Sequence, residues 1–527
     1  MNTSTRSRRP SQRARRIRRR PPTRTIRRHQ DQPLLWPDDK RPGPVFRNRQ
    51  VRLETQQRGK VTPYGGLALA HDQAMRLGID RDINRSIHLL KLHMPYSESD
   101  HILTHVYNLY VGGQCIEDIA NLQHSEAVKH LVGACRIPDP TTAGDFLRRF
   151  EAYHLGTFQA VIDQAREKVW RKLPRRRKKV GTVDMDSTLK EVYGHCKQGA
   201  DFSYNGKWSY HPLLLSLAET NEPLRTLNRP GNVTSADGAA KALHEVLPMV
   251  GRHFETVTVR GDSAFYQRAI LAACEEHHAR FAIVMDGYQV LHDRADALDP
   301  SAWKPFRPRR AQDVARDATQ RRSRRKRQRL RPRRARERGY TTLKTTHQWV
   351  AEFSYTLPRQ DKASDFGLGG RTYRVVVKRQ EVDVSEGQDY LFTEDRQRFV
   401  ITNIPRSEMN AGDVVSFAYG RCDQENIIEQ LKNGIAAMRM PTGELLANGA
   451  FLMAGQLAWC LRSWLSLLAL PTETLRWEWK WFRQAFVYVA AKITQTGRRC
   501  VAYLADGHRF IEHLLIASQR LQSFTFD

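Results

Sequence analysis

The stretch Thr256-Val-Thr-Val-Arg-Gly-Asp262 is followed a short distance later by Arg280-Phe-Ala-Ile-Val-Met-Asp286. Both runs are apolar, contain β-branched residues and end in an aspartate, which predicts two buried strands. The Ala- and Leu-rich segment between them, roughly 267–277, has the length and composition of one helix. A strand–helix–strand unit joins parallel strands, so the sequence predicts an α/β sheet with at least one parallel pair.

Further β runs lie on both sides of this unit. Residues 181–189 and 211–218 precede it and extend the predicted sheet. Three alternating segments follow it: 349–357, 373–378 and 398–402. We therefore interpret 290–403, which includes an Arg-rich stretch, as an inserted, mainly β subdomain. The core is then expected to consist of two parts, 181–289 and 404–470.

Residues 61–180 have the helical periodicity of a compact all-α module that ends in a basic linker. Ser97 and Ser125 are predicted helix N-caps, and Thr142 followed by Asp145 has the form of a capping box. Short helices joined by Gly turns fit a helix-turn-helix DNA reader. They fit any small helical bundle as well.

The net charge of +30, with a pI near 10.1, favours association with polyanions such as nucleic acid or an acidic membrane surface. Residues 1–30 contain 12 Arg, residues 171–179 contain 7 basic residues, and residues 304–338 contain 17 basic residues and 3 acidic ones. The remainder is close to neutral, which suits a protein that grips a polyanion at defined places. The alternative is that these runs are solvated tails, and 1–60 is predicted to be a basic disordered tail.

The seven cysteines are scattered and form no Cys-x-x-Cys pair, which favours reduced thiols in a cytosolic protein over structural zinc or disulfides. No signal peptide or transmembrane segment is expected. The most apolar stretch, 445–470, is interrupted by Arg462 and is interpreted as a buried core helix. The region 471–527 is predicted to be helical, and its Trp- and Phe-rich part, 477–486, is expected to be core.

Carboxylates stand at the ends of two predicted strands. Asp184 and Asp186 lie two residues apart and therefore point to the same face of their strand. Charged groups in a strand that also contains Val183 and Met185 are costly unless they are paired or bind a metal. Asp262 closes its strand at the sheet edge where ligands gather in open α/β folds. A strand-end Asp is also a common cap or turn acceptor, so each residue alone is only a candidate.

A third carboxylate lies in the segment Tyr419-Gly-Arg-Cys-Asp-Gln-Glu425-Asn-Ile-Ile-Glu-Gln-Leu-Lys432. At about 100° per residue, an α-helix places Arg421, Glu425 and Lys432 within about 40° of one another. The apolar residues of the segment fall on a separate face: Ile427, Leu431, Ile435 and Met438. By itself the pattern also fits an amphipathic surface helix in which Arg421 and Glu425 form an ordinary i,i+4 pair.

The spacing Tyr-x-Arg-x₃-Glu-x₆-Lys at 419–432 resembles the signature around the last carboxylate of bacterial insertion-sequence transposases with an RNase H-like DDE domain. Five other stretches resemble that family in the same order: 137–146, 184–188, 204–207, 229–232 and 260–263. The resemblance covers roughly 95–470. It implies an α/β fold with an RNase H-like catalytic core, interrupted by a β-strand insertion, preceded by an all-α module and followed by C-terminal helices.

The resemblance implies that Asp186, Asp262 and Glu425 are catalytic carboxylates that hold two Mg²⁺ ions, for which Mn²⁺ is expected to substitute. The family pattern places the first Asp before Ser/Thr-Thr, which favours Asp186, whereas the residues alone leave Asp184 open. Supporting roles at the site fall to Tyr419, Arg421 and Lys432.

The implied function is metal-dependent DNA cleavage and strand transfer at terminal inverted repeats, that is, cut-and-paste transposition of an insertion sequence. Expected partners are double-stranded DNA at the repeats and target and a second copy of the chain in a homodimeric synaptic complex, with no membrane. The nucleic-acid-binding candidates are Arg175, Arg176, Arg177, Lys178, Lys179 and Trp349. Trp303 or Trp349 could stack on a flipped base or belong to the core. The implied location is the bacterial cytoplasm, at the nucleoid.

Three alternatives remain open. A catalytically inactive or domesticated relative would bind DNA through its basic runs alone, and the three carboxylates argue against it. Another RNase H-like nuclease would share the metal chemistry but need neither the helical module nor the Tyr-Arg-Glu-Lys helix. An Arg-rich RNA- or membrane-binding protein accounts for the charge and leaves the carboxylates unexplained.

Overall fold

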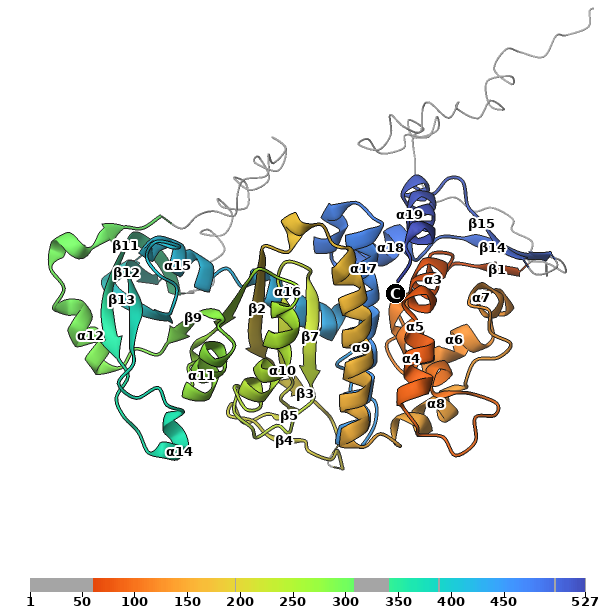
Figure 1. Ribbon diagram of the computed structural model, residues 1–527, viewed down its shortest axis with the longest axis horizontal. Helices are drawn as coiled ribbons and strands as arrows, with labels where there is room; N and C mark the ends of the chain where they lie inside the picture. Colours follow the sequence, from red (N-terminus) through yellow and green to blue (C-terminus); the bar gives the residue numbers. More distant parts are fainter. Residues whose placement is uncertain (1–59, 195, 308–340, 387–388, 497–498, 527) are drawn as a thin grey trace, which may run out of the picture. The chain divides into compact units, whose positions relative to one another are not determined.

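A nine-stranded mixed sheet organises the computed structural model (Figure 1). The structure describes residues 60–194, 196–307, 341–386, 389–496 and 499–526, so the predicted tail and most of the 304–338 run lie outside it. The strand order is β10-β11-β12-β13-β9-β8-β2-β6-β7. The bounds are β2 (Val180–Ser187), β6 (Leu213–Leu217), β7 (Glu222–Leu227), β8 (Thr256–Gly261), β9 (Arg280–Met285), β10 (Lys304–Pro305), β11 (Thr341–Thr356), β12 (Thr372–Glu386) and β13 (Asp389–Thr402).

The middle of the sheet combines parallel and antiparallel pairs. β2 pairs in parallel with β8, with Val183 opposite Val259, and β8 pairs in parallel with β9, with Gly261 opposite Ile283. The helix α11 (Arg268–Glu276) connects β8 to β9, so the predicted strand–helix–strand unit is confirmed. β6 and β7 continue the sheet as antiparallel strands on the other side of β2.

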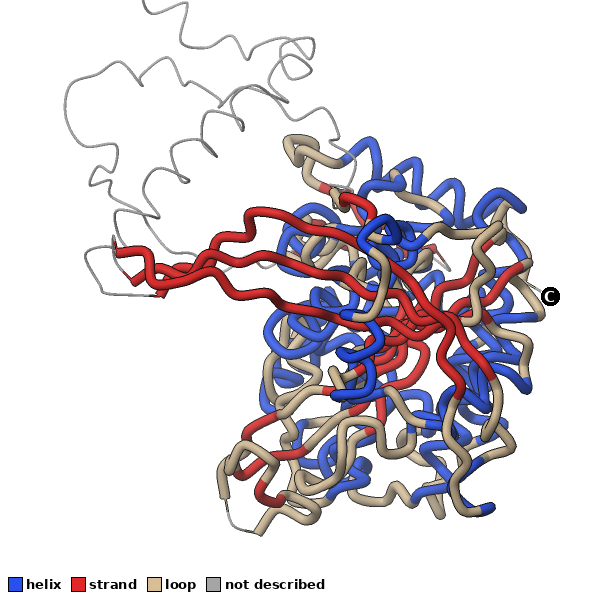
Figure 2. The backbone as a smooth tube through the Cα atoms, turned by 90° about the vertical axis from the view of Figure 1, so that its left-hand side faces the viewer, coloured by secondary structure: helices blue, strands red, loops and turns tan. Residues whose placement is uncertain are grey.

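The strands within the predicted insertion do not form a separate sheet. β13 pairs antiparallel with β9, placing Val400 opposite Val284, and β12, β11 and β10 follow in antiparallel order. Figure 2 shows the long strands of this region running side by side. The segments expected to be strands are therefore strands, but they extend further than their alternating patterns predicted and they enlarge the core sheet.

Successive side chains of each core strand point to opposite faces of the sheet. One face carries Val183, Val259 and Phe281 and packs with α10 (Ala239–Gly251), α11 and α12 (Gln289–Asp296). Along β2, Asp184 and Asp186 alternate with Val183 and Met185 and therefore point to the other face. The opposite face contacts α15 (Ala411–Ala418) and α16 (Cys422–Glu429), so the candidate carboxylates of β2 lie on the side of α16.

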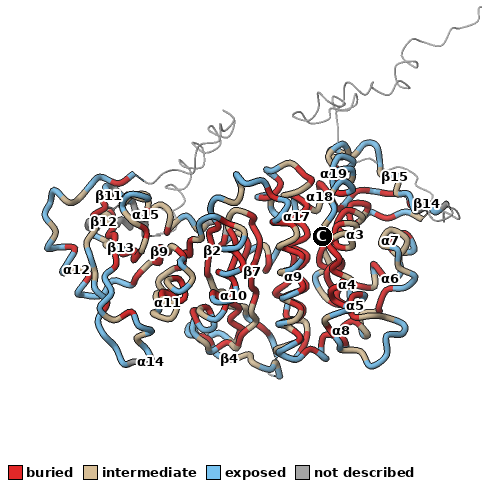
Figure 3. The backbone as a smooth tube through the Cα atoms, in the orientation of Figure 1, coloured by how far each residue is buried: buried red, intermediate tan, exposed pale blue. Residues whose placement is uncertain are grey.

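The helix α17 (Leu445–Leu468) links the sheet to the helical module. It packs against β7 and against α3 (Leu67–Leu77), α5 (Glu98–Val111) and α9 (Ala152–Lys172). Within the described ranges it is the one helix long and apolar enough to cross a membrane, but 94% of its most apolar window is buried inside the protein (Figure 3). The interpretation of this stretch as a buried core helix is confirmed.

The predicted helix starts of the module are mostly correct. Ser97 is the N-cap of α5, and Ser125 is the N-cap of α7 (Glu126–Leu131). The capping box predicted at Thr142 is wrong, because Asp139 caps α8 (Pro140–Leu147) and its Oδ1 accepts the backbone N–H of Thr142 at 3.0 Å. The remaining helices of the module are α4 (Ile79–Ser86), η1 (Glu117–Ile119) and α6 (Ala120–Gln123).

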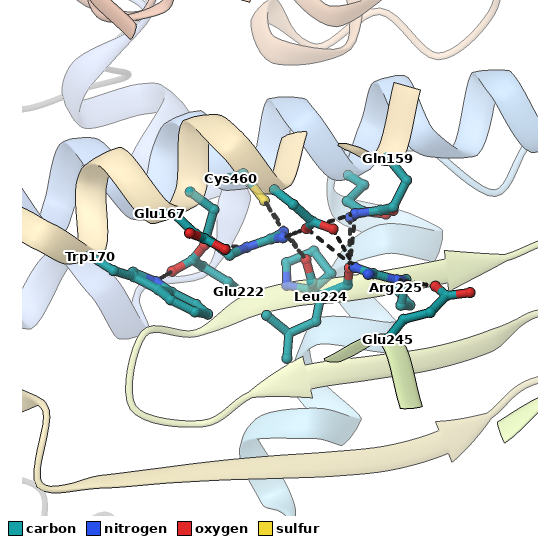
Figure 4. Close-up of polar contacts among 12 residues, drawn as sticks. Gln159, Glu167, Trp170, Glu222, Leu224, Arg225, Glu245 and Cys460 are labelled. Carbon is teal, nitrogen blue, oxygen red and sulfur yellow. Dashed lines mark hydrogen bonds and ion pairs between the residues drawn. The ribbon is translucent and has the colours of Figure 1, made fainter. Parts of the chain in front are cut away.

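A buried ionic network attaches α9 to β7 and α17 (Figure 4). Arg166 is fully buried, and its Nε donates to Oε2 of Glu222 at 3.0 Å. Glu222 also accepts from the indole N–H of Trp170 at 2.8 Å and of Trp464 at 2.7 Å. Three elements distant in sequence thus share one buried carboxylate.

The chain after α17 is less helical than predicted. Helices η6 (Thr472–Arg476) and α18 (Trp479–Phe486) are followed by the antiparallel strands β14 (Ala491–Thr496) and β15 (Arg499–Leu504) and by α19 (Ile511–Ser523). β14 also pairs with β1 (Lys60–Thr62), at the start of the described chain. Trp479 and Phe482 are buried, as the core interpretation of this stretch requires.

Candidate active site

Asp184 is held in a buried ion pair. Nε and Nη2 of Arg260 donate to its two carboxylate oxygens at 2.6 and 2.7 Å, and Asp184 is completely buried. The pair arises from the register, because Asp184 on β2 lies opposite Arg260 on β8. Arg260 also donates to the carbonyls of Phe417 and Gly420. This guanidinium therefore fixes two strands and the chain that enters α16.

Asp186 stands on the same face of β2, near its carboxyl end. Its Oδ1 accepts the backbone N–H of Ser187 at 2.7 Å. Burial raises the pKa of Asp186 to about 6; the charge of Arg421 opposes this rise, whereas Asp262 and Glu425 add to it. Asp262 and Glu425 thus lie close enough to Asp186 for their charges to act on it, although the three carboxylates come from separate elements.

Asp262 follows β8 directly and caps the short helix η3 (Ser263–Phe265), its Oδ1 accepting the backbone N–H of Ala264 at 3.1 Å. Its side chain is 41% exposed. Because β2 and β8 are parallel neighbours, their carboxyl ends meet at one edge of the sheet. Arg421 bridges the two strand ends: Nη1 donates to the carbonyl of Met185 at 3.1 Å, and Nη2 lies 3.8 Å from Oδ2 of Asp262.

Glu425 belongs to α16, which is anchored by residues on its buried side. Gln424 is fully buried, accepts a hydrogen bond from the hydroxyl of Ser216 and donates to the carbonyl of Leu214 at 3.3 Å. Ile427 is also fully buried, whereas Glu425 is exposed. Since Gln424 ties α16 to β6, the helix is held in one rotation and Glu425 remains accessible near Asp186.

The helix changes its geometry after Glu425. Arg421 is the N-cap of α16, and after Glu429 the chain continues as a π-helical turn, η5 (Gln430–Gly434). The prediction of one α-helix that continues to Lys432 is therefore wrong at its C-terminal end, since a π turn advances by a different angle per residue. At the other end, Arg421 caps the helix. Lys432 nevertheless reaches the site, where its ammonium donates to the hydroxyl of Thr188 just after β2. Burial lowers the pKa of Lys432.

Tyr419 is the C-cap of α15 and lies two residues before Arg421. Its ring packs against the apolar cluster between α15 and the strands β9, β12 and β13, and the ammonium of Lys378 lies 5.7 Å from the ring centre. Burial raises the pKa of Tyr419. The residue therefore supports the entry to α16 from the side of the insertion.

The predicted DNA-binding residues do not gather around the carboxylates. η2 (Arg175–Arg177) and the following Lys178 and Lys179 precede β2, at the opposite end of that strand from Asp186. The separation is about 20 Å at roughly 3.3 Å per residue. Trp349 on β11 stacks on His347 at 5.6 Å. β11 lies five strand positions from β2, which is about 24 Å at roughly 4.8 Å per strand.

The structure adds supporting residues that the sequence analysis did not single out. The imidazole of His211 is 3.0 Å from the hydroxyl of Ser187 and 3.0 Å from the carbonyl of Val233. Arg229 donates to the carbonyl of His211 at 2.7 Å, so the 229–232 stretch acts on the strand end through His211. The pairing of Arg260 could have been anticipated from the sequence, because a charged residue within an apolar strand requires a partner.

The carboxylate set fits hard divalent cations. Three carboxylates provide only oxygen donors, as Mg²⁺ prefers, and their mutual repulsion at Asp186 is the kind of interaction that a bound cation relieves. They do not form a compact single-ion cluster, since the one group of three His, Cys, Asp or Glu residues with all ligand atoms within 4.8 Å in the described ranges lies elsewhere.

Comparison with known proteins identifies the family. The family model described as transposase DDE domain group 1 matches residues 44–525. Among solved structures, the chain is similar to piggyBac transposase, seen by cryo-EM as a synaptic complex with hairpin DNA, with a TM-score of 0.31, 8% identity and coverage of 80% of this chain and 84% of that chain. No curated protein sequence matches significantly. Because the family model spans nearly the whole sequence, this chain belongs to the transposase DDE domain group 1 family.

Proposed function

We propose that the chain catalyses metal-dependent DNA cleavage and strand transfer at the terminal inverted repeats of a bacterial insertion sequence. The observation that carries the proposal is the convergence of three carboxylates, since the charges of Asp262 and Glu425 both act on Asp186. Membership of a transposase family supports the reaction class. The excision and reinsertion of the element are proposed to follow a cut-and-paste course in the cytoplasm.

The catalytic core is proposed to be RNase H-like. Support comes from the strand order β7-β6-β2-β8-β9, in which β6 is antiparallel to β2, whereas β8 and β9 run parallel to it. The central strand β2 carries the first proposed carboxylate and its parallel neighbour β8 ends at the second. The third follows the insertion, at α16. The proposed boundaries remain 181–289 and 404–470 for the two parts of the core.

Asp186, Asp262 and Glu425 are the proposed ligands of two Mg²⁺ ions, for which Mn²⁺ is expected to substitute. Ions held there would supply activation of a water or 3′-hydroxyl and stabilisation of the leaving oxygen in phosphodiester transfer. The chain contributes a fixed ligand geometry, because the Asp184–Arg260 pair holds β2, β8 and the entry to α16 together before DNA arrives. Such prior organisation lowers the free energy needed to align the reacting groups.

Arg421 and Lys432 are proposed to contact phosphates beside the carboxylates. Arg421 is oriented by the Met185 carbonyl and Asp262, and a guanidinium with further donors suits bidentate recognition of a phosphate. Lys432 is directed toward the strand end by Thr188. Tyr419 is proposed to hold the start of α16 in place. All three side chains are thus positioned by contacts within the protein before DNA binds.

The basic residues before β2 are proposed to bind DNA away from the cleaved bond. Arg175, Arg176 and Lys179 are exposed, and their distance from Asp186 suits flanking or target DNA. Trp349 is a proposed stacking residue of the insertion. A homodimer is proposed for the synapsis of two ends, since paired cleavage requires a site at each end.

The proposal is tested by Mg²⁺-dependent cleavage of linear DNA carrying both element ends. Asp186→Asn, Asp262→Asn and Glu425→Gln should each abolish cleavage while retaining DNA binding in a mobility-shift assay, because they remove metal ligands and leave the fold intact. Glu429→Gln is the matched control, since Glu429 is exposed one turn further along the same helix and should retain cleavage. Full activity in any of the three variants would remove that residue from the site.

A second outcome would change the proposed function itself. If the unaltered chain binds the element ends but fails to cleave them with either Mg²⁺ or Mn²⁺, it is an inactive relative that acts as a DNA-binding protein. If the chain instead cleaves branched DNA or RNA–DNA hybrids in preference to the element ends, its function is that of another RNase H-like nuclease.

A further inference from the structure

Three metal-ligating side chains meet on the helices α10 and α11, on the other face of the sheet from Glu425. Nδ1 of His244 lies 3.1 Å from Nε2 of His277 and 3.8 Å from Oε2 of Glu276. One ligand atom from each residue lies within 4.8 Å of the other two. His244 comes from α10, whereas Glu276 and His277 lie at the end of α11.

The distances match the coordination geometry of a small transition-metal ion. With Zn–N bonds of roughly 2.0–2.1 Å and tetrahedral angles, two ligand nitrogens stand about 3.3–3.4 Å apart. The observed 3.1 Å between His244 and His277 is within a few tenths of an ångström of this value. Two imidazoles with one carboxylate favour Zn²⁺ over Mg²⁺, which prefers oxygen ligands.

Backbone hydrogen bonds fix the end of α11, where Glu276 and His277 lie. His277 is the C-cap of α11, and its N–H donates to the carbonyl of Ala273 at 3.2 Å. His278 follows with a φ of 52°, and Ala279 N–H then donates to the carbonyl of Cys274 at 2.8 Å, closing the helix end. Below the surface, α10 and α11 share one apolar cluster. The two helices that carry the cluster are therefore packed together before an ion binds.

The cluster is accessible and is separate from the proposed active site. The side chains of His244 and Glu276 are 43% and 66% exposed, so an ion can reach them from solvent. Asp262 precedes α11, whereas His277 follows it, and a helix of this length separates its ends by about 13 Å. The cysteine pattern predicted no structural zinc, but this cluster contains no cysteine and has no local spacing motif.

We propose that His244, Glu276 and His277 form a second metal site that takes Zn²⁺ or a similar transition-metal ion and clamps α10 to α11. The three residues provide three ligands, and water completes a tetrahedron. The site would stabilise the helices that flank β8 on one face of the sheet. This proposal does not depend on the proposed DNA cleavage.

The test measures Zn²⁺ binding to the full chain, stripped of metal, by isothermal titration calorimetry in excess Mg²⁺. His244→Gln and His277→Gln should each weaken one binding event at least tenfold, because each removes a ligand. His278→Gln is the matched control, since His278 is adjacent but is not part of the cluster, and it should bind as the unaltered chain does. Equal Zn²⁺ affinity and stoichiometry in all four proteins would overturn the proposal.

Two further measurements test the alternatives. One distinguishes a metal bound at this cluster from a metal bound by cysteines, and the other distinguishes a metal site from two imidazoles that only hydrogen-bond to each other. Co²⁺ should give visible bands of a tetrahedral site without the thiolate charge-transfer band, whereas a strong thiolate band would assign the ion to cysteines and refute the proposal. Zn²⁺ should also raise the melting temperature of the unaltered chain and of Asp262→Asn, but not of His244→Gln. If the two imidazoles only hydrogen-bond to each other, Zn²⁺ will leave the melting temperature unchanged.

Discussion

Asp184 and Asp186 share one face of β2, but they have different surroundings. Asp184 accepts hydrogen bonds from Nε and Nη2 of Arg260, whereas Asp186 lies near Arg421, Asp262 and Glu425. The two-residue period of a strand could not separate them, since it places both on the same side. Only the register between β2 and β8, which is a long-range feature, brings Arg260 to Asp184.

The Asp184–Arg260 pair should contribute mainly to stability. Asp184→Asn leaves a buried guanidinium without its charged partner, and such changes cost about 3–5 kcal/mol. Urea unfolding of the variant should show this loss of free energy. Asp262→Asn is the control, because Asp262 is 41% exposed, and its unfolding free energy should change by no more than about 1 kcal/mol. A stable Asp184→Asn protein that fails to cleave DNA would instead place Asp184 in the metal site.

The helix that carries Glu425 was predicted in outline but not in detail. Helical spacing correctly separated a buried side, with Ile427 and Leu431, from the side of Glu425. It could not predict the π turn at 430–434, because the turn depends on tertiary contacts such as the backbone N–H of Trp479 donating to Gln430 Oε1 at 2.9 Å. The strands β14 and β15 were missed because the region 471–527 was interpreted as helical throughout, although the apolar residues Ala491 and Ile493 of β14 alternate with polar ones.

Glu222 joins β7 to α9 and α17, so substituting it should cause a large loss of stability. Glu222→Gln should cost about 3 kcal/mol, since Arg166 stays fully buried while losing a charged partner. Glu245→Gln is the matched control: Glu245 pairs with Arg225 at 3.1 Å but is 48% exposed, so its loss should cost at most about 1 kcal/mol. Chemical denaturation of both variants measures the difference. Equal costs would mean that the buried network adds no stability beyond a surface pair.

Two glycines within helices should respond to alanine with opposite signs. A Cβ at Gly455 in α17 would lie 2.2 Å from the Cβ of Ala437, whereas a Cβ at Gly156 in α9 meets nothing within 4 Å. Gly455→Ala should destabilise the protein by roughly 1–3 kcal/mol through overpacking. Gly156→Ala should stabilise it by about 0.5–1 kcal/mol through helix propensity. Thermal unfolding of both variants checks the signs, and a stabilised Gly455→Ala would show that α17 can move away from Ala437.

At the scale of the whole molecule, local patterns predicted which segments become strands and helices better than they predicted how these meet. The extension of the core sheet by β13 and the position of α17 between β7 and the helical module depend on pairings between distant segments. No periodicity encodes such pairings. The three carboxylates could be proposed together because a family resemblance links positions that lie far apart in the sequence, whereas the His244 cluster has no such signature.

The distribution of charge leads to a prediction about DNA binding by the whole protein. Replacing Arg175, Arg176 and Lys179 with Gln should flatten the dependence of log K on log salt by up to about 2.7, at roughly 0.9 per phosphate contact removed. Cleavage at saturating DNA should stay near that of the unaltered chain, since these residues precede β2 while Asp186 lies near its far end. Fluorescence anisotropy at several salt concentrations measures the slope.

A charge-matched control separates a defined DNA contact from general attraction. The lysines Lys241, Lys480 and Lys492 are also exposed but belong to α10, α18 and β14. Their replacement by Gln removes the same net charge, so long-range attraction falls equally in the two triple variants. If the residues before β2 contact phosphates, only their substitution changes the salt slope by more than about one unit. Equal slopes in both triple variants would make the run at 175–179 part of the general positive charge and would leave the DNA path to other residues.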